Sequence, residues 1–281
     1  MLDRQVFQLT DNFRKWKRRI QDLLFDYEVG RRILRGRSLE RPVAPWENSV
    51  LRKAGEWKGA LDQVERLGLP IHLELTKNWD SIAALDCILA RTTREARILD
   101  AGGERYSVIL LWLCLYGYRD LHGINLSFDS VFRRGPITYE PGDITATRYE
   151  WDSFDAVTCL SVIEHGVDIW KYFREMSRIL KPGGVLVTSV DYYESPLDTA
   201  GKTAYGVPVH IFSREEVLEA LSVARDCGLH LTGPLDLRSE EKIVHWGGLD
   251  LEYTFLVFTL IKIPPGRTEP DIFTSQGGGR G

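Results

Sequence analysis

The sequence predicts an α/β fold, in which a doubly wound, seven-stranded and mostly parallel sheet ends in an antiparallel edge strand. Two observations lead to this fold class. Short apolar segments alternate with helical patterns from residue 97 onward, and such alternation gives right-handed crossovers and parallel strands. The last apolar segment follows Gly247-Gly248 with no helix between them, which predicts a hairpin and an antiparallel strand.

The expected elements follow from apolar periodicity and from turn residues. The strands are expected at residues 98–101, 121–125, 137–139, 154–159, 185–190, 230–235 and 251–263. Helices are expected at residues 104–117, 168–180 and 214–227. The turn Lys181-Pro182-Gly183-Gly184 leads into the fifth strand.

A helical extension or lid is expected over residues 1–93, ahead of the main domain at 94–264 and a disordered tail at 265–281. Within residues 6–34, apolar side chains recur every three or four positions, and the opposite face is basic. Residues 1–60 carry 14 Lys and Arg against 8 Asp and Glu. Such a helix either packs on the core or on a second copy in a homodimer, or contacts an anionic membrane or a lipid-linked substrate.

A second helix is expected at residues 81–90, with Asp80 or Ser81 as its N-cap. Trp79 stands just before it, close in sequence to the first core strand. This indole either covers a cofactor or belongs to the core.

Composition excludes several classes of protein. The net charge of −4 and the acidic balance after residue 60 argue against a general nucleic-acid binder. The four cysteines show no CxxC spacing, so neither a zinc site nor a disulfide framework is expected, and no bound metal is expected. The N-terminal residues carry charges throughout, and the longest apolar run, residues 108–116, is too short to cross a membrane. We therefore expect a cytoplasmic protein.

Polar or Gly-rich residues follow five of the expected elements in register, and together they form the most specific signal in the chain. The segments are Asp100-Ala101-Gly102-Gly103, Gly123-Ile124-Asn125, Gly142-Asp143-Ile144, Ser161-Val162-Ile163-Glu164-His165 and Lys181-Pro182-Gly183-Gly184. This series resembles the motifs of class I S-adenosylmethionine-dependent methyltransferases, type-11 group, over residues 96–263. The resemblance implies a Rossmann-like fold and S-adenosylmethionine as cofactor.

The resemblance also implies roles for individual residues. Asp100, Gly102 and Gly103 are expected at the methionine end of the cofactor, with Asn125 at the ribose and Asp143 and Ile144 at the adenine. Ser161 and Trp79 complete the expected cofactor site. Two departures from the family pattern stand out, because Glu104 and Tyr106 replace further glycines and Asn125 replaces the usual acidic residue.

Residues that leave the fourth and fifth strands are expected near the transferred methyl group. They include Glu164, His165, Asp191, Tyr192 and Tyr193, and His210 precedes a later helix that reaches the same cleft. His165, Asp191 and His210 are the candidate catalytic residues, and His165 is the first candidate for a general base because its ordinary pKa is near neutral. The alternative is a structural role for each histidine.

These patterns predict methyl transfer to a hydroxyl oxygen of a small-molecule or glycan-type acceptor. The first alternative is a catalytically silent subunit of the same fold that scaffolds or activates a partner. The second is a nicotinamide-dependent oxidoreductase, although the Gly-rich loop lacks the GxGxxG spacing of that class.

Overall fold

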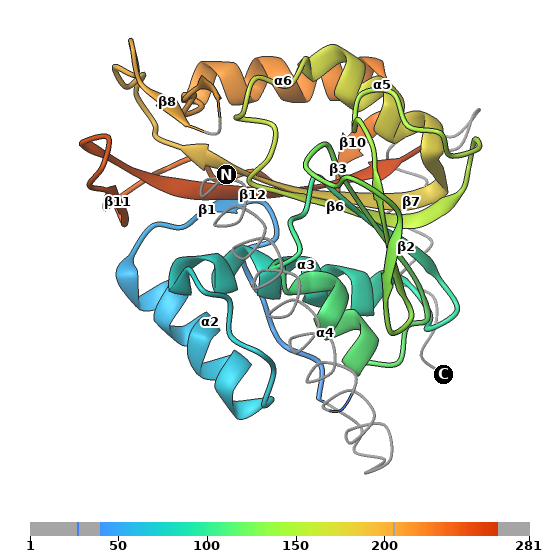
Figure 1. Ribbon diagram of the computed structural model, residues 1–281. Coiled ribbons are helices and arrows are strands. Elements are labelled where there is room, and N and C mark those ends of the chain that lie inside the picture. The colour runs from blue at the N-terminus through green and yellow to red at the C-terminus, as the bar shows by residue number, and fades with distance from the viewer. Residues whose placement is uncertain (1–26, 28–39, 205, 264–281) are drawn as a thin grey trace, which may run out of the picture.

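The computed structural model describes residue 27, residues 40–204 and residues 206–263. In this part of the chain, ten strands form one sheet (Figure 1). Its main path runs β1 (Ser49–Val50), β12 (Leu251–Lys262), β7 (Leu180–Tyr192), β6 (Phe154–Leu160), β2 (Arg97–Ala101), β3 (Asp120–Asn125), β5 (Ile137–Pro141) and β4 (Phe132–Arg134). Two further strands, β10 (Leu229–Leu231) and β11 (Val244–Trp246), pair with β12.

The centre of the sheet is parallel, as expected. Neighbours within the series β5, β3, β2, β6 and β7 pair in parallel, whereas β12 runs antiparallel to β7. The predicted fold class is therefore confirmed, and each of the seven expected strands has a counterpart. The short strands β1, β4 and β11 extend this sheet, and β8 (Thr203–Ala204) pairs with β9 (Val207–Pro208) in a separate hairpin.

Helices cover both faces of the sheet (Figure 1). One face carries α2 (Ala54–Arg66), α3 (Asn78–Arg91) and α4 (Ile109–Leu115), and the other carries α5 (Ile169–Ile179) and α6 (Arg214–Asp226). Two apolar cores result, because alternate side chains of each strand point to opposite faces, as Ile98 and Leu99 do. Both helices of the second face begin with a side-chain cap, from Asp168 in α5 and from Ser213 in α6.

Several element boundaries differ from the prediction. Strand β7 begins at Leu180 and so includes residues 181–184, which were expected to form a turn ahead of a strand at 185–190. Helix α4 starts at Ile109 instead of residue 104, because residues 104–107 form a turn closed by the Ser107 N–H donating to the Glu104 carbonyl over 2.9 Å. Helix α3 starts at Asn78, directly after the 3-10 helix η1 (Leu75–Lys77). The predicted capping role of Asp80 or Ser81 is therefore wrong, since both lie inside the helix. Strand β10 ends at Leu231, ahead of Gly233-Pro234.

The region ahead of the main domain is described from residue 40 onward. Its strand β1 is hydrogen-bonded to β12, and α3 packs against β6, β7 and β12. The expected basic helix at residues 6–34 and the expected disordered tail at 265–281 lie outside the described residues, apart from Tyr27. None of the described helices has both the length and the apolar composition that a bilayer span requires.

Candidate active site at the carboxyl ends of the strands

The turn after β2 leaves no room for side chains. Gly102 has a φ of +86°, and a Cβ atom there would lie 2.4 Å from Val162 Cγ1. At Gly103 a Cβ atom would lie 1.8 Å from Asp100 Oδ2. Glycine is therefore required at both positions, by backbone conformation at Gly102 and by close approach at Gly103.

Asp100 lies buried under this turn, with 3% of its surface exposed. Its Oδ1 accepts a hydrogen bond from Thr158 Oγ1 over 2.8 Å. Burial raises the pKa of the Asp100 carboxyl to about 7, with a further increase from the Asp80 carboxylate, while the Thr158 hydrogen bond opposes both. The side chain is thus enclosed beneath the turn, in which Gly102 is partly exposed and Gly103 is buried.

The expected ribose residue has another structural role. Asn125 Nδ2 donates to the Gly102 carbonyl over 2.6 Å, and Asn125 Oδ1 accepts from the Ser127 N–H over 2.8 Å. The amide can make the first of these bonds, whereas an ionised carboxylate in its place has no proton to donate. Ser127 also donates to Glu104 Oε1 over 2.9 Å, so Glu104 ties the first turn to the loop after β3.

The expected adenine residues lie on the loop after β5. Asp143 is exposed, and its Oδ1 accepts hydrogen bonds from both the N–H and the hydroxyl of Thr145, each over 2.8 Å. Ile144 is buried, with 7% of its surface exposed. This geometry is an Asx turn, which directs the loop and leaves the carboxylate at the surface.

Two carboxyl groups meet where β6 and β7 end. Glu164 and Asp191 are 1% and 5% exposed, and the Asp191 N–H donates to Glu164 Oε1 over 3.3 Å. Burial, and then the Asp191 charge, raises the pKa of Glu164 to about 8. Burial also raises the pKa of Asp191 to about 6, although Lys77 and a hydrogen bond from Tyr253 lower it. Burial thus favours the protonated form of both carboxyl groups, and more strongly that of Glu164.

A lysine at the end of η1 accompanies this pair. Lys77 Nζ donates to Ser161 Oγ, lies 3.7 Å from Asp80 Oδ2, and lies 3.5 Å from the centre of the Phe255 ring. It lowers the pKa of both Glu164 and Asp191. Sequence reasoning missed Lys77, because nothing in the local pattern shows that η1 reaches the ends of β6 and β7.

The remaining predicted residues are distributed unevenly around the pair. Ser161 follows β6 with a φ of +52° and accepts the Lys77 hydrogen bond. His165 is partly buried, and burial, followed by the Lys77 charge, lowers its pKa, so its imidazole is neutral at pH 7. His210 Nε2 lies 3.4 Å from Glu216 Oε1, and His210 lines a cavity together with Glu164.

Trp79 lies away from any surface that a ligand could reach. Its side chain is fully buried, and its ring stacks on Trp46 with a centroid distance of 5.9 Å. The structure therefore places Trp79 in the core of α3, where the indole has no exposed surface for a cofactor. No group of three or more His, Cys, Asp and Glu side chains within the described ranges is arranged to hold a metal ion.

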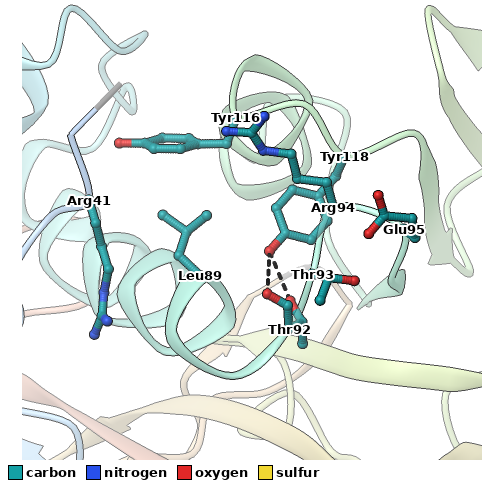
Figure 2. Close-up of a pocket in the computed structure, with 8 residues that line it drawn as sticks. All are labelled: Arg41, Leu89, Thr92, Thr93, Arg94, Glu95, Tyr116 and Tyr118. Carbon is teal, nitrogen blue, oxygen red and sulfur yellow. Dashed lines mark hydrogen bonds between the residues drawn. The ribbon is translucent and has the colours of Figure 1, made fainter. Parts of the chain in front are cut away.

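A second cavity, of about 430 Å³, lies near the amino ends of β2 and β3 (Figure 2). Thr92, Arg94 and Tyr118 contribute to its wall, close to the residues that enter β2 and β3. Figure 2 shows the hydroxyl of Tyr118 directed at Thr92, with 2.9 Å between Tyr118 Oη and Thr92 Oγ1. Because ligands of open α/β sheets bind at the carboxyl ends of the strands, this cavity is not the candidate active site.

Comparison with known proteins identifies the central part of the chain. A family model described as a methyltransferase domain matches residues 99–188, from β2 to β7. This segment is a class I S-adenosylmethionine-dependent methyltransferase domain of the type-11 group. The cofactor of such a domain is S-adenosylmethionine, as the resemblance in the sequence implied.

Curated relatives match the methyltransferase domain at low identity. A sterol 24-C-methyltransferase of Debaryomyces hansenii is 27% identical over 119 residues, which are 39% of this chain and 31% of the relative. A ubiquinone biosynthesis O-methyltransferase of Xanthomonas oryzae pv. oryzae is 33% identical over 119 residues, or 37% of this chain and 47% of the relative. The match thus spans less than half of either relative.

Solved structures of methyltransferases also align with the chain. An S-adenosylmethionine-dependent methyltransferase from Mesorhizobium loti is 20% identical, with a TM-score of 0.46, and the alignment covers 66% of this chain and 97% of that one. A geranyl diphosphate C-methyltransferase from Streptomyces coelicolor is 16% identical, with a TM-score of 0.49 and coverage of 81% and 91%.

Proposed function

We propose that the chain transfers a methyl group from S-adenosylmethionine to a hydroxyl oxygen of a small-molecule or glycan-type acceptor. The observation that carries this proposal is the buried pair of Glu164 and Asp191 at the ends of β6 and β7. A hydroxyl acceptor needs a general base, and a base works best when its pKa lies near the working pH. The relative named as an O-methyltransferase, at 33% identity, supports oxygen as the acceptor atom.

The turn after β2 fits the cofactor of the domain. Gly102 is partly exposed and carries no side chain, so a ligand can approach its main chain closely, and the buried Gly103 keeps the turn tight. We assign these two residues and Ser161 to the methionine end, and Asp143 and Ile144 to the adenine. S-adenosylmethionine supplies a methyl group on a positively charged sulfur.

The chain's own residues handle the proton. In this proposal the ionised Asp191 accepts the proton of the acceptor hydroxyl as the oxygen–carbon bond forms and the sulfur–carbon bond breaks. Glu164, with the higher pKa, holds its own proton at neutral pH and reduces the repulsion between the two groups. Lys77 stabilises the ionised form of the pair through its charge.

Calorimetric titration of the full chain with S-adenosylmethionine tests the first half of the proposal. Saturable binding supports it, whereas absence of binding at millimolar cofactor favours the silent scaffold subunit. Transfer of labelled methyl from the cofactor to a panel of alcohols and phenols tests the second half. Asp191→Asn should lower kcat by about 10²- to 10⁴-fold and leave cofactor affinity within about twofold, while the exposed Glu215→Gln changes neither.

His165 is the second candidate for the base, because its lowered pKa keeps the imidazole able to accept a proton at pH 7. A drop in kcat for His165→Ala with Asp191→Asn fully active would move the role to the histidine.

We also propose a cytoplasmic location. No disulfide joins the four cysteines, and three of them are buried, which is typical of proteins in a reducing compartment.

A further inference from the structure

A cavity of about 360 Å³ opens between the loop after β6 and helix α6. Its size falls within the range of sites that hold small organic ligands, about 300–1,000 Å³. Most of its wall is apolar. The apolar lining residues are Ile163, Val167, Ile169, Phe212, Ala220 and Val223.

Glu164 connects this cavity to Asp191, the proposed general base. It lines the cavity, is 1% exposed, and accepts from the Asp191 N–H through Oε1. Its Oε2 is buried and has no hydrogen-bond partner among the described residues. A buried polar atom without a partner costs free energy, so a ligand group that hydrogen-bonds to Oε2 gains affinity from the site.

The charged groups around the cavity have one dominant sign. Its ionisable lining residues are Glu164, Glu216, Glu219 and His210, and neither Lys nor Arg is among them. His210 is close to Glu216, with 3.4 Å between Nε2 and Oε1, so this carboxylate already has a neighbour. An anionic ligand would meet the carboxylates of Glu216 and Glu219, and no Lys or Arg side chain in the cavity wall compensates for them.

We propose that this cavity binds the methyl acceptor, and that the acceptor is an uncharged, largely apolar alcohol or phenol whose hydroxyl hydrogen-bonds to Glu164 Oε2. The assignment rests on the proposed function and specifies its substrate class. Within the small-molecule and glycan-type acceptors expected from the sequence, it selects a lipophilic alcohol and excludes a phosphorylated one. The apolar wall contacts the body of the ligand, and Glu164 places the hydroxyl beside Asp191.

Three naphthalene derivatives of similar shape test the charge preference at pH 7. They are 2-naphthol, which is uncharged, 2-naphthoate, which is anionic, and 2-naphthylmethylammonium, which is cationic. Affinities are measured by NMR titration of the full chain without cofactor. We expect 2-naphthol to bind at least fivefold more tightly than 2-naphthoate. Equal or tighter binding of the anion, tighter binding of the cation than of 2-naphthol, or no binding of 2-naphthol would overturn the assignment.

Matched variants on α6 locate the binding. Ala220→Phe fills the cavity from its wall and should abolish 2-naphthol binding, whereas Leu218→Phe on the exposed side of the helix should not change it. Glu219→Lys, tested alongside Glu215→Lys, should reduce the preference for 2-naphthol over 2-naphthoate by about two- to fivefold. If Ala220→Phe is poorly folded, the pair of Glu→Lys variants decides. Equal effects of the two would place the ligand elsewhere.

The two proposals fail in different ways. A chain that binds S-adenosylmethionine but not 2-naphthol keeps the proposed function and loses the acceptor assignment. A chain that binds 2-naphthol in this cavity but not S-adenosylmethionine loses the proposed function, and the cavity is then a ligand site without methyl transfer.

Discussion

Replacement of the buried Asp100 by Asn should make the protein more stable at alkaline pH. The unfolded carboxyl ionises at its ordinary pKa of 3.8, whereas burial keeps the folded group protonated up to about pH 7. Between these values the folded state holds a proton that the unfolded state has lost, so stability falls as the pH rises through this window. Each pH unit costs about 1.4 kcal/mol, so the interval from pH 5 to pH 7 costs about 3 kcal/mol.

Asn at position 100 keeps an acceptor for the Thr158 hydroxyl and does not titrate. The gain in stability of Asp100→Asn over the original chain should therefore be about 3 kcal/mol larger at pH 8 than at pH 5. Urea unfolding followed by tryptophan fluorescence at the two pH values measures this difference.

The exposed Asp168 provides a control of opposite kind. Its carboxylate accepts from the Lys171 N–H over 3.0 Å, and that hydrogen bond lowers its pKa. Asp168 is thus ionised at both pH 5 and pH 8, and Asp168→Asn should change stability by a similar amount at each. If Asp100→Asn likewise has the same effect at both pH values, Asp100 is not protonated in the folded protein and the argument from burial is wrong.

Three further changes probe the site. Gly103→Ala would place a Cβ atom 1.8 Å from Asp100 Oδ2. We therefore expect the free energy of unfolding to fall by about 1–3 kcal/mol and cofactor binding to weaken. The control Gly59→Ala in α2 places a Cβ with no atom within 4 Å and should not destabilise the protein. Asp143→Ala should weaken S-adenosylmethionine binding severalfold in calorimetry, and an unchanged affinity would show that this residue only shapes its loop. Lys77→Met should raise the pKa of Asp191, because the lysine lowers it now, and should move the rising limb of the pH–activity profile to higher pH. An unmoved profile would show that Lys77 does not act on the proposed base.

The sequence was sufficient for the parallel centre of the sheet, because each strand there is a short apolar segment between turn residues. It also located Asp191 and Glu164, since residues directly after parallel strands share one edge. Helix α4 was predicted too long because residues 104–107, Glu-Arg-Tyr-Ser, contain no Gly or Pro to mark a turn. The turn that they form is tied by Glu104 to Ser127 of the loop after β3, a contact that the local pattern does not show.

Side chains that reach the site from distant segments could not be predicted in the same way. Lys77 precedes the first core strand by about twenty residues, and Tyr253 lies on the last strand, yet both influence the pKa of Asp191. Trp79 shows the converse error. Its position in the sequence suggested a surface over the cofactor, but α3 turns this indole into the core, where it stacks on Trp46.

Strand β12 determines the order in which the chain can complete its fold. It pairs antiparallel with β7 and also with β1, β10 and β11. Its pairing with β1 joins Ser49 to Val257, two residues that are separated in sequence by most of the described chain. Contacts of such sequence separation slow folding, because the chain must close a long loop before they form. During synthesis, β7 has no partner on that side until residues 251–262 emerge from the ribosome. Until then the newly made chain exposes an apolar strand edge, and this period is when it is most prone to aggregate.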